Sequence, residues 1–359
     1  MVRLFRKKNK ENTDIVQSTI RTHYSVTDEE IKNYADGANS NLKVMHFTHT
    51  DIAGKVCSVI GQRTFANIET KYCSNRDVDD IINTFILIDR KFSDYDLILI
   101  TDVSLNEGTL VNLQKIQEFT NGAVKVEYYN HQECNIEYSN NYSWVTIEPE
   151  YFDTKQDSAS IFYRHMMQEY SLVGDDWLDT LVEKSRRYTK WEWKALEDEV
   201  PNSLSMLCHD AGHKFFVKKL IKKHISNSQL LDEEDFDKLD YLEQKYQQYK
   251  ERKINEVILS RIGNAKVGFV LAEQHIDRLG YDIPNHYKNL DSVVLINSLV
   301  ALNIRNTQDA LINANEIAKV FGGNGEKKAA GAGIPVDIRE EMIKHLINIS
   351  QERFKKIKK

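Results

Sequence analysis

The chain has 359 residues, of which 41% are hydrophobic and 28% charged, and its formal net charge is −6. This composition is that of an ordinary globular protein, and the acidic balance excludes a uniformly basic nucleic-acid binder but not a local basic groove. No apolar run approaches the roughly 18 residues that span a bilayer, so we expect no membrane partner. The cysteines Cys57, Cys73, Cys134 and Cys208 are widely spaced, which favours reduced thiols and a cytoplasmic protein.

The first half of the chain predicts a parallel sheet. Residues 1–42 are expected to form an N-terminal extension with a basic start and a short helix near 27–34. Strands are then predicted over 43–47, 68–73, 96–101, 124–129 and 143–148, and helices over 55–65, 76–91 and 109–119. Strands that alternate with helices of this length indicate an α/β fold with a doubly wound parallel sheet.

The second half predicts a connector and a smaller domain. Helices are expected throughout 158–220, and the long charged segment 232–262 is predicted to be one connecting helix. A second α/β unit follows, with strands over 266–272, 292–295 and 300–305 and helices over 274–279, 314–321 and 336–356. We therefore expect a first domain over 43–231, a connecting helix over 232–262 and a C-terminal domain over 263–359.

Polar side chains follow three of the predicted strands. His49 and Asp51 come after the first strand, Asp102 ends the strongly apolar third strand, and His131 follows the fourth. Ligands of open α/β sheets bind beyond the carboxyl ends of the strands, and imidazole with carboxylate is a ligand set for Mn²⁺, Fe²⁺ or Zn²⁺. These four residues are predicted to form a metal or phosphate site. The alternative is that they are ordinary polar loop residues.

The segment 322–333, GGNGEKKAAGAG, is the second candidate site. Gly322, Gly323 and Gly325 allow backbone N–H groups to approach an anion, and Lys327 and Lys328 add positive charge. The segment lacks the GK[ST] of a nucleotide-binding P-loop. It predicts an anion-binding loop, and the alternative is a tight connection.

Two further groups of residues have weaker signals. His209 and His213 have the spacing of helical metal ligands, but no third ligand lies nearby in sequence, so we expect them to be structural. Tyr188, Trp191 and Trp193 have helical spacing and are expected to be mainly core residues. Stacking of a nucleobase is the alternative.

The motifs and their order along the chain resemble those of the DHH phosphoesterase family over roughly 43–335. The segment His49-Thr-Asp51-Ile-Ala53-Gly54 resembles the first family motif, H-x-D-x-D-G, and Asp102 resembles the aspartate of the second. Asn130-His131-Gln132 falls where the family has Asp-His-His. The glycine-rich segment resembles the GGGGH-x-x-AAG signature of the DHH-associated C-terminal domain, and 302–305 resembles the strand that supplies an arginine, here Arg305.

The resemblance implies hydrolysis of a phosphodiester or phosphoanhydride in a short oligonucleotide, a single strand, a cyclic dinucleotide or pyrophosphate. It implies two metals, usually Mn²⁺, in the first domain, and a second domain that closes over the substrate. Asp102 and His131 are the implied catalytic residues. The implied substrate-binding residues are Arg305, Gly322, Gly323, Gly325, Lys327 and Lys328.

The chain also departs from the family pattern. Ala53, Asn130 and Gln132 replace metal ligands, Glu326 replaces the histidine of the glycine-rich signature, and 187–191 reads RYTKW where relatives read RYDTW. The surviving His49, Asp51, Asp102 and His131 are enough for one metal, Mn²⁺ or another divalent ion. Losing even an outer-shell partner costs about 10–100-fold in metal affinity or activity, and ligand losses cost more.

Two functions follow from these matches and losses. The first is a pseudoenzyme that binds a nucleotide or short single-stranded nucleic acid through Arg305, Lys327 and Lys328, or that regulates a protein partner, with weak or no hydrolysis. The second is an active metal-dependent phosphodiesterase on short oligonucleotides, single-stranded nucleic acid or cyclic dinucleotides.

Overall fold

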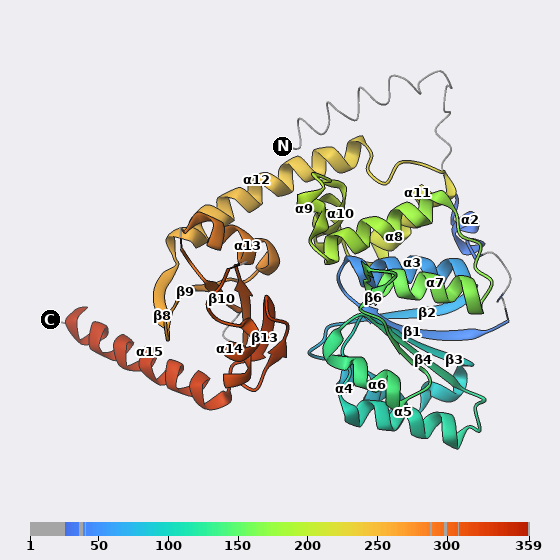
Figure 1. Cartoon of the computed structure of the whole chain (residues 1–359), viewed down its shortest axis with the longest axis horizontal. Helices are drawn as coiled ribbons and strands as arrows, with labels where there is room; N and C mark the ends of the chain where they lie inside the picture. Colours follow the sequence, from blue (N-terminus) through green and yellow to red (C-terminus); the bar gives the residue numbers. More distant parts are fainter. Residues whose placement is uncertain are drawn as a thin grey trace. The chain divides into compact units, whose positions relative to one another are not determined.

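The computed structural model describes residues 26–35, 39, 41–287, 289–297, 300–307 and 309–357. The predicted basic start at 1–25 lies outside these residues. The chain divides into two compact units, Met1–Asp240 and Tyr241–Lys359, and each is described by itself (Figure 1). None of the helices within the described ranges is both long and apolar enough to cross a bilayer.

The first unit is built on a five-stranded parallel sheet of order β2-β1-β3-β4-β5. Its strands are β1 (Lys43–His49), β2 (Asn67–Cys73), β3 (Leu97–Thr101), β4 (Lys125–Asn130) and β5 (Val145–Ile147). All five residues of the central strand β3 are buried, as expected for a strand covered on both faces. The predicted doubly wound parallel sheet is confirmed.

Helices cover both faces of this sheet (Figure 1). One face carries α4 (Val78–Asn83), α5 (Glu107–Phe119) and α6 (Ile136–Asn141). The other face carries a larger group, formed by α3 (Ile52–Thr64), α7 (Ser158–Glu169), α8 (Asp176–Thr189) and α11 (His213–Ile225). The remaining helices are α2 (Asp28–Lys32), α9 (Glu192–Ala195) and α10 (Val200–Asp210).

Local signals explain where several helices begin. Asp51, Asn106, Asp157 and Asp175 are the N-cap residues of α3, α5, α7 and α8, and each side chain accepts a hydrogen bond from a backbone N–H of the first turn. The single helix predicted over 76–91 was wrong in its second half. There α4 passes into a π-helical turn at Thr84–Ile88 and a 3₁₀ turn at Lys91–Asp94. A two-stranded hairpin, β6 (Glu150–Tyr151) and β7 (Thr154–Lys155), was not predicted.

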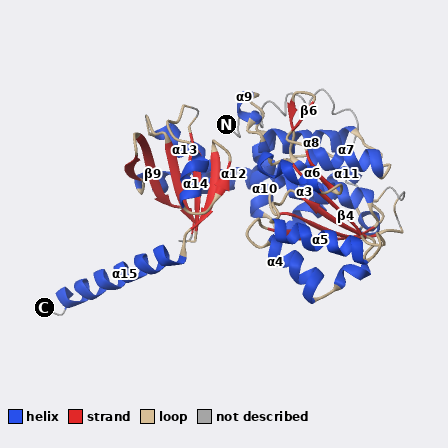
Figure 2. Ribbon diagram, turned by 60° about the horizontal axis from the view of Figure 1, so that its bottom comes forward, coloured by secondary structure: helices blue, strands red, loops and turns tan. Residues whose placement is uncertain are grey.

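The second unit contains a mixed six-stranded sheet of order β12-β13-β11-β10-β9-β8 (Figure 2). Its strands are β8 (Ile258–Ile262), β9 (Ala265–Leu271), β10 (Ser292–Asn297), β11 (Ala301–Asn306), β12 (Asn324–Gly325) and β13 (Ala329–Gly333). The helices are α13 (Ile276–His286), α14 (Ala314–Val320) and α15 (Val336–Ile357). Separate apolar clusters pack α13 and α14 against the sheet, so this unit is the predicted smaller α/β domain.

The long connecting helix predicted over 232–262 was wrong at its C-terminal end. The helix α12 covers Glu233–Asn255, and Ile258–Ile262 forms strand β8, which pairs antiparallel with β9. Gly263 and Asn264 make the turn between these strands, with a positive φ of 57° at Gly263. The turn brings Ile258 opposite Phe269, a pairing that a helix would not allow.

Candidate metal centre

The candidate centre lies at the carboxyl end of β1, where the strand meets α3. His49 is the last residue of β1, and the Asp51 Oδ1 atom accepts a 3.0 Å hydrogen bond from the Gly54 N–H in the first turn of α3. A Cβ atom on Gly54 would lie 2.2 Å from the His49 carbonyl oxygen. Glycine is therefore required at this position for the helix to start so close to the strand end.

Side chains from two strand ends converge at this point. One ligand atom each of His49, Asp51 and Asp102 lies within 4.8 Å of the other two. The His49 Nδ1 atom is 3.0 Å from Asp51 Oδ2. Asp102 follows β3 in a left-handed conformation with φ of 60°, which is uncommon outside glycine and is often found at functional sites. Of the four predicted ligands, three form one compact group.

The pKa values of the two neighbouring carboxyl groups are shifted in opposite directions. Burial raises the pKa of Asp102 well above its usual range, and the neighbouring Asp51 charge raises it further. Burial alone would also raise the pKa of Asp51, but His49, a hydrogen bond from Asp102 and the Gly54 N–H together hold that pKa below its ordinary value. The Asp102 Oδ2 atom is buried without a hydrogen-bond partner. This donor set fits a divalent cation.

His131 lies beside this group. Its Nδ1 atom is 3.7 Å from Asp102 Oδ1 and 2.9 Å from the Ser158 hydroxyl oxygen. Burial and, to a lesser degree, the Lys190 charge lower the pKa of His131 to about 3, although Asp51 acts in the opposite direction. The ring is therefore neutral near pH 7. The structure places this predicted ligand next to Asp102 but outside the compact group of three.

The residues that replace family ligands have structural contacts. The Asn130 amide donates to the Val103 carbonyl and to the Tyr128 hydroxyl, and its oxygen accepts from the His131 N–H. Gln132 accepts a hydrogen bond from the Ser104 hydroxyl. Ala53 is buried in the first turn of α3. The Asn130 and Gln132 side chains thereby link the end of β4 to the loop after β3.

Sequence reasoning missed Asp157. This fully buried carboxylate caps α7 and accepts hydrogen bonds from the Ser160 N–H at 2.8 Å and from the Ser185 hydroxyl at 2.7 Å. Burial raises its pKa, while these hydrogen bonds and, more weakly, Lys190 lower it. The signal in the sequence was the N-cap pattern Asp-Ser before an apolar helix face. Asp157 precedes Ser158, which holds His131, and therefore belongs to the surroundings of the centre.

The predicted substrate-binding residues of the second unit meet at one corner of its sheet. Arg305 on β11 lies opposite Ala329 on β13, next to the turn that carries Lys327 and Lys328. The Arg305 guanidinium donates to Asp277 at 2.6 Å and to the Ile304 carbonyl at 3.1 Å. An anion at this corner would therefore compete with Asp277 for the arginine.

The three predicted glycines each have a backbone reason to be glycine. Gly322 has φ of 71° and follows the end of α14. A Cβ atom on Gly323 would lie 2.2 Å from the Gly331 carbonyl oxygen, and one on Gly325 would lie 2.4 Å from Ala330 Cα. The expected loop is in fact a strand pair, β12 and β13, whose close approach requires small residues. Anion binding by this segment remains a prediction.

The weaker candidates separate in the structure. His209 lies in the last turn of α10 and His213 begins α11, so the two histidines do not share one helix face. Within the described residues, the group His49, Asp51 and Asp102 is the one cluster of three or more histidine, cysteine or acidic side chains with converging ligand atoms. Trp193 is a core residue at 5% exposure, as expected, whereas 38% of Trp191 is exposed.

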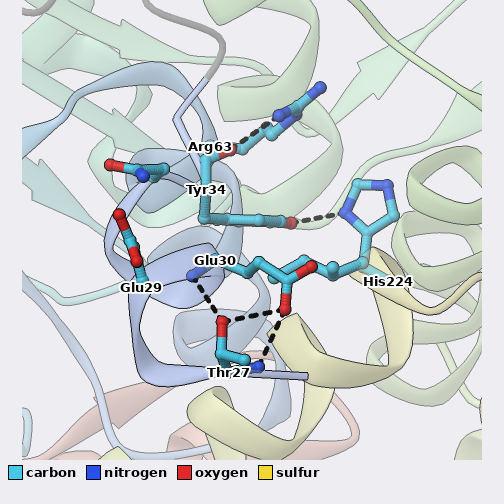
Figure 3. A pocket seen from close by; sticks show the side chains of 8 residues that line it. Thr27, Glu29, Glu30, Tyr34, Arg63 and His224 are labelled. Atoms are coloured by element: carbon cyan, nitrogen blue, oxygen red, sulfur yellow. Dashed lines mark hydrogen bonds between the residues drawn. The ribbon is translucent and has the colours of Figure 1, made fainter. Parts of the chain in front are cut away.

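A separate cavity of about 550 Å³ lies beside α2 (Figure 3). In it, the Tyr34 hydroxyl is 2.5 Å from His224 Nδ1, and His224 Nε2 is 2.7 Å from Asp175 Oδ2. Arg63 donates to the Tyr34 carbonyl at 2.6 Å. None of the candidate metal ligands lines this cavity, and these contacts fasten α2 to α3 and α11.

Comparisons with known proteins agree with the motifs. No family model matches the chain. The oligoribonuclease NrnB of Bacillus subtilis (strain 168) is 24% identical over 311 residues, which cover 86% of this chain and 77% of that protein. A 3′,5′-cyclic-nucleotide phosphodiesterase of Helicobacter pylori is 26% identical over 163 residues, 42% of this chain and 44% of that protein.

Two solved structures share the architecture. The DHH domain of a member of the s1p family of ribosomal proteins superimposes with a TM-score of 0.55 at 10% identity, covering 96% of this chain and 98% of that chain. RecJ in complex with Mn²⁺ from Thermus thermophilus gives 0.50 at 12% identity, over 86% of this chain and 52% of that chain. The chain therefore has the fold of the DHH phosphoesterases, and the resemblance drawn from its motifs is confirmed.

Proposed function

We propose that this protein is a metal-dependent phosphodiesterase that hydrolyses short oligonucleotides. The observation that supports this most directly is the convergence of His49, Asp51 and Asp102 within 4.8 Å at the strand ends of a DHH fold. The alignment with an oligoribonuclease over 86% of the chain supports the substrate class. The proposal revises the expectation of a silent protein, because the three ligands form a compact site despite the substitutions around them.

His49, Asp51 and Asp102 would hold one divalent cation, Mn²⁺ being the first candidate. When bound, such a cation polarises a phosphoryl oxygen and lowers the pKa of its water. The chain supplies the rest. Gly54 and the Asp51 cap fix the carboxylate at the start of α3, and the left-handed backbone of Asp102 directs its side chain to the same point. His131, neutral and bonded to Ser158, lies beside Asp102 and is placed to orient groups there through hydrogen bonds.

The second unit is proposed to bind the substrate's phosphates. Arg305 and the turn with Lys327 and Lys328 place positive charge at one corner of its sheet. Gly325 on the edge strand β12, and Gly322 and Gly323 in the turn before it, border this corner. Guanidinium and ammonium groups both pair well with phosphate oxygens.

A second candidate is a cytoplasmic nucleotide-binding protein with weak or no hydrolysis. One observation favours it. Asn130 and Gln132 are committed to hydrogen bonds with Val103, Tyr128 and Ser104, so they do not complete a second metal site. For such a protein, the second unit would bind the nucleotide, and the first unit would no longer hydrolyse it.

Turnover and metal content distinguish the two candidates. The assay is Mn²⁺-dependent hydrolysis of an end-labelled ribodinucleotide by the full chain, with elemental analysis of the purified protein. Asp102→Asn is expected to reduce turnover more than about 100-fold and to lower bound metal, because it removes a charged ligand. Asp89→Asn, at a 41% exposed side chain, is the matched control. Micromolar dinucleotide binding without turnover in the wild type would favour the second candidate.

A further inference from the structure

The turn between α8 and α9 contains a strained tryptophan. Trp191 has φ of 59°, in the left-handed region that a bulky side chain rarely adopts. Its side chain is 38% exposed, while Trp193, two residues later, is 5% exposed and anchors the turn in the core. Strained backbone that persists at an exposed aromatic side chain is typical of a functional position.

A network of ion pairs holds this turn. The Arg186 guanidinium lies 2.8 Å from Glu183 and 2.8 Å from Glu192, which spans the turn from α8 to α9. Arg187 contacts Asp198 at 3.0 Å. These ion pairs hold the backbone on both sides of Trp191, so the turn is preorganised for a ligand, which lowers the entropy cost of binding.

The same network places the turn beside the candidate metal centre. Arg186 Nη1 donates to the Lys155 carbonyl at 3.3 Å, and the Ser185 hydroxyl donates to Asp157 at 2.7 Å. These contacts fasten the last turns of α8 to the residues just before Ser158, which holds His131. Lys190, the residue before Trp191, is the C-cap residue of α8, and its backbone N–H donates to the Arg186 carbonyl at 2.9 Å.

We propose that the Lys190–Trp191 turn is a nucleotide subsite, in which the Trp191 indole stacks on a nucleobase and Lys190 contacts the adjoining phosphate. The inference rests on the proposed function, because it places the base of the oligonucleotide whose phosphodiester lies at His49, Asp51 and Asp102. An exposed indole beside a phosphate site is the combination by which proteins bind single strands without reading their sequence. The ammonium of Lys194, 5.8 Å from the centre of the Trp191 ring, adds positive charge to this surface.

Equilibrium binding tests the subsite. The probe is a fluorescently labelled ribodinucleotide with a phosphorothioate linkage, compared with an analogue that has the same backbone but no bases. Trp191→Ala is expected to weaken binding of the dinucleotide about 5- to 150-fold, the range for loss of one stacked base. Binding of the base-free analogue is expected to stay unchanged. Trp191→Phe is expected to recover part of the loss.

Two further variants test whether any loss of binding comes from damage to the fold. Phe119→Ala removes an 80% exposed aromatic side chain at the opposite end of the sheet and is expected to leave binding unchanged. Trp191→Gly fits the positive φ but removes the ring contacts with Tyr188 and Trp193, so its binding is measured well below its melting temperature; dinucleotide binding is expected to fall there and binding of the base-free analogue to stay unchanged. If Trp191 served only the fold, its replacement by glycine would weaken binding of both probes equally.

The outcomes separate this inference from the proposed function. Binding that depends on Trp191 in a protein without turnover supports the subsite and refutes hydrolysis. Turnover with unchanged dinucleotide binding in Trp191→Ala refutes the subsite alone. Equal weakening of the dinucleotide and the base-free analogue also refutes base stacking. A wild type that binds neither probe refutes the subsite, and if it also lacks turnover, both proposals are refuted.

Discussion

The fully buried His46 is expected to make the first unit sensitive to acid. It lies in β1, three residues before His49, with Nε2 2.8 Å from the Thr101 hydroxyl and Nδ1 without a partner. Burial lowers the pKa of His46 to about 3, so the folded protein keeps the ring neutral at pH values where the unfolded chain has it charged.

The sign and size of the effect follow from this shift. Because the folded pKa lies below the ordinary value of 6.5, stability is present above pH 6.5 and is lost as pH falls through that value. At pH 5, which is about 1.5 units below the unfolded pKa, the free energy of unfolding is expected to be lower by about 2 kcal/mol for this one histidine, since each pH unit contributes roughly 1.4 kcal/mol. His131, whose pKa is also about 3, is expected to add a similar loss.

Urea denaturation at pH 7 and pH 5 measures this loss. All four tryptophans of the chain, Trp144, Trp177, Trp191 and Trp193, lie in the first unit, so tryptophan fluorescence follows that unit. His46→Gln is expected to reduce the pH-dependent loss of unfolding free energy by about 2 kcal/mol, whatever its stability at pH 7. His209→Gln, at an exposed histidine of the same unit, is the control. An unchanged pH dependence in His46→Gln would refute the reasoning.

Three glycine substitutions test the backbone arguments. Gly54→Ala is expected to cost more than about 2 kcal/mol in urea denaturation and to reduce bound Mn²⁺, because its Cβ would lie 2.2 Å from the His49 carbonyl oxygen; unchanged metal content would contradict this. Gly323→Ala is expected to lower the melting temperature followed by circular dichroism, and Lys327→Ala to leave it unchanged; the reverse order would refute the structural role of the glycine. Gly263→Ala, at φ of 57°, is expected to cost about 1 kcal/mol in the same melts, and no cost would show that the turn relaxes.

The sequence predicted the parallel sheet correctly, and it predicted that His49, Asp51 and Asp102 lie at neighbouring strand ends, because both depend on local order. Alternation of strands and helices is read along the chain, and the carboxyl ends of parallel strands meet at one edge. His49, Asp51 and Asp102 therefore converge without any knowledge of the packing. Asp51 also caps α3, which the pattern of polar residues before an apolar helix indicates.

Contacts between distant segments decided the rest. The segment 258–262 follows the charged helical segment without a proline or glycine between them, so the local pattern predicts that the helix continues. Pairing with Ala265–Phe269 makes it a strand instead. The roles of Asn130 and Gln132 depend on Val103, Tyr128 and Ser104, which lie on the same strand as Asn130 and in the loop after the neighbouring strand β3.

By itself, the sequence determined the fold class and which residues gather at the strand ends. The tertiary structure decided that three candidate ligands form one compact group, that the glycines of 322–325 allow strands to pack, and that Trp191 is partly exposed while Trp193 is buried. Periodicity fixes the direction of a side chain relative to its own helix or strand. The exposure and partners of that side chain depend on segments far away in the chain, which no local pattern records.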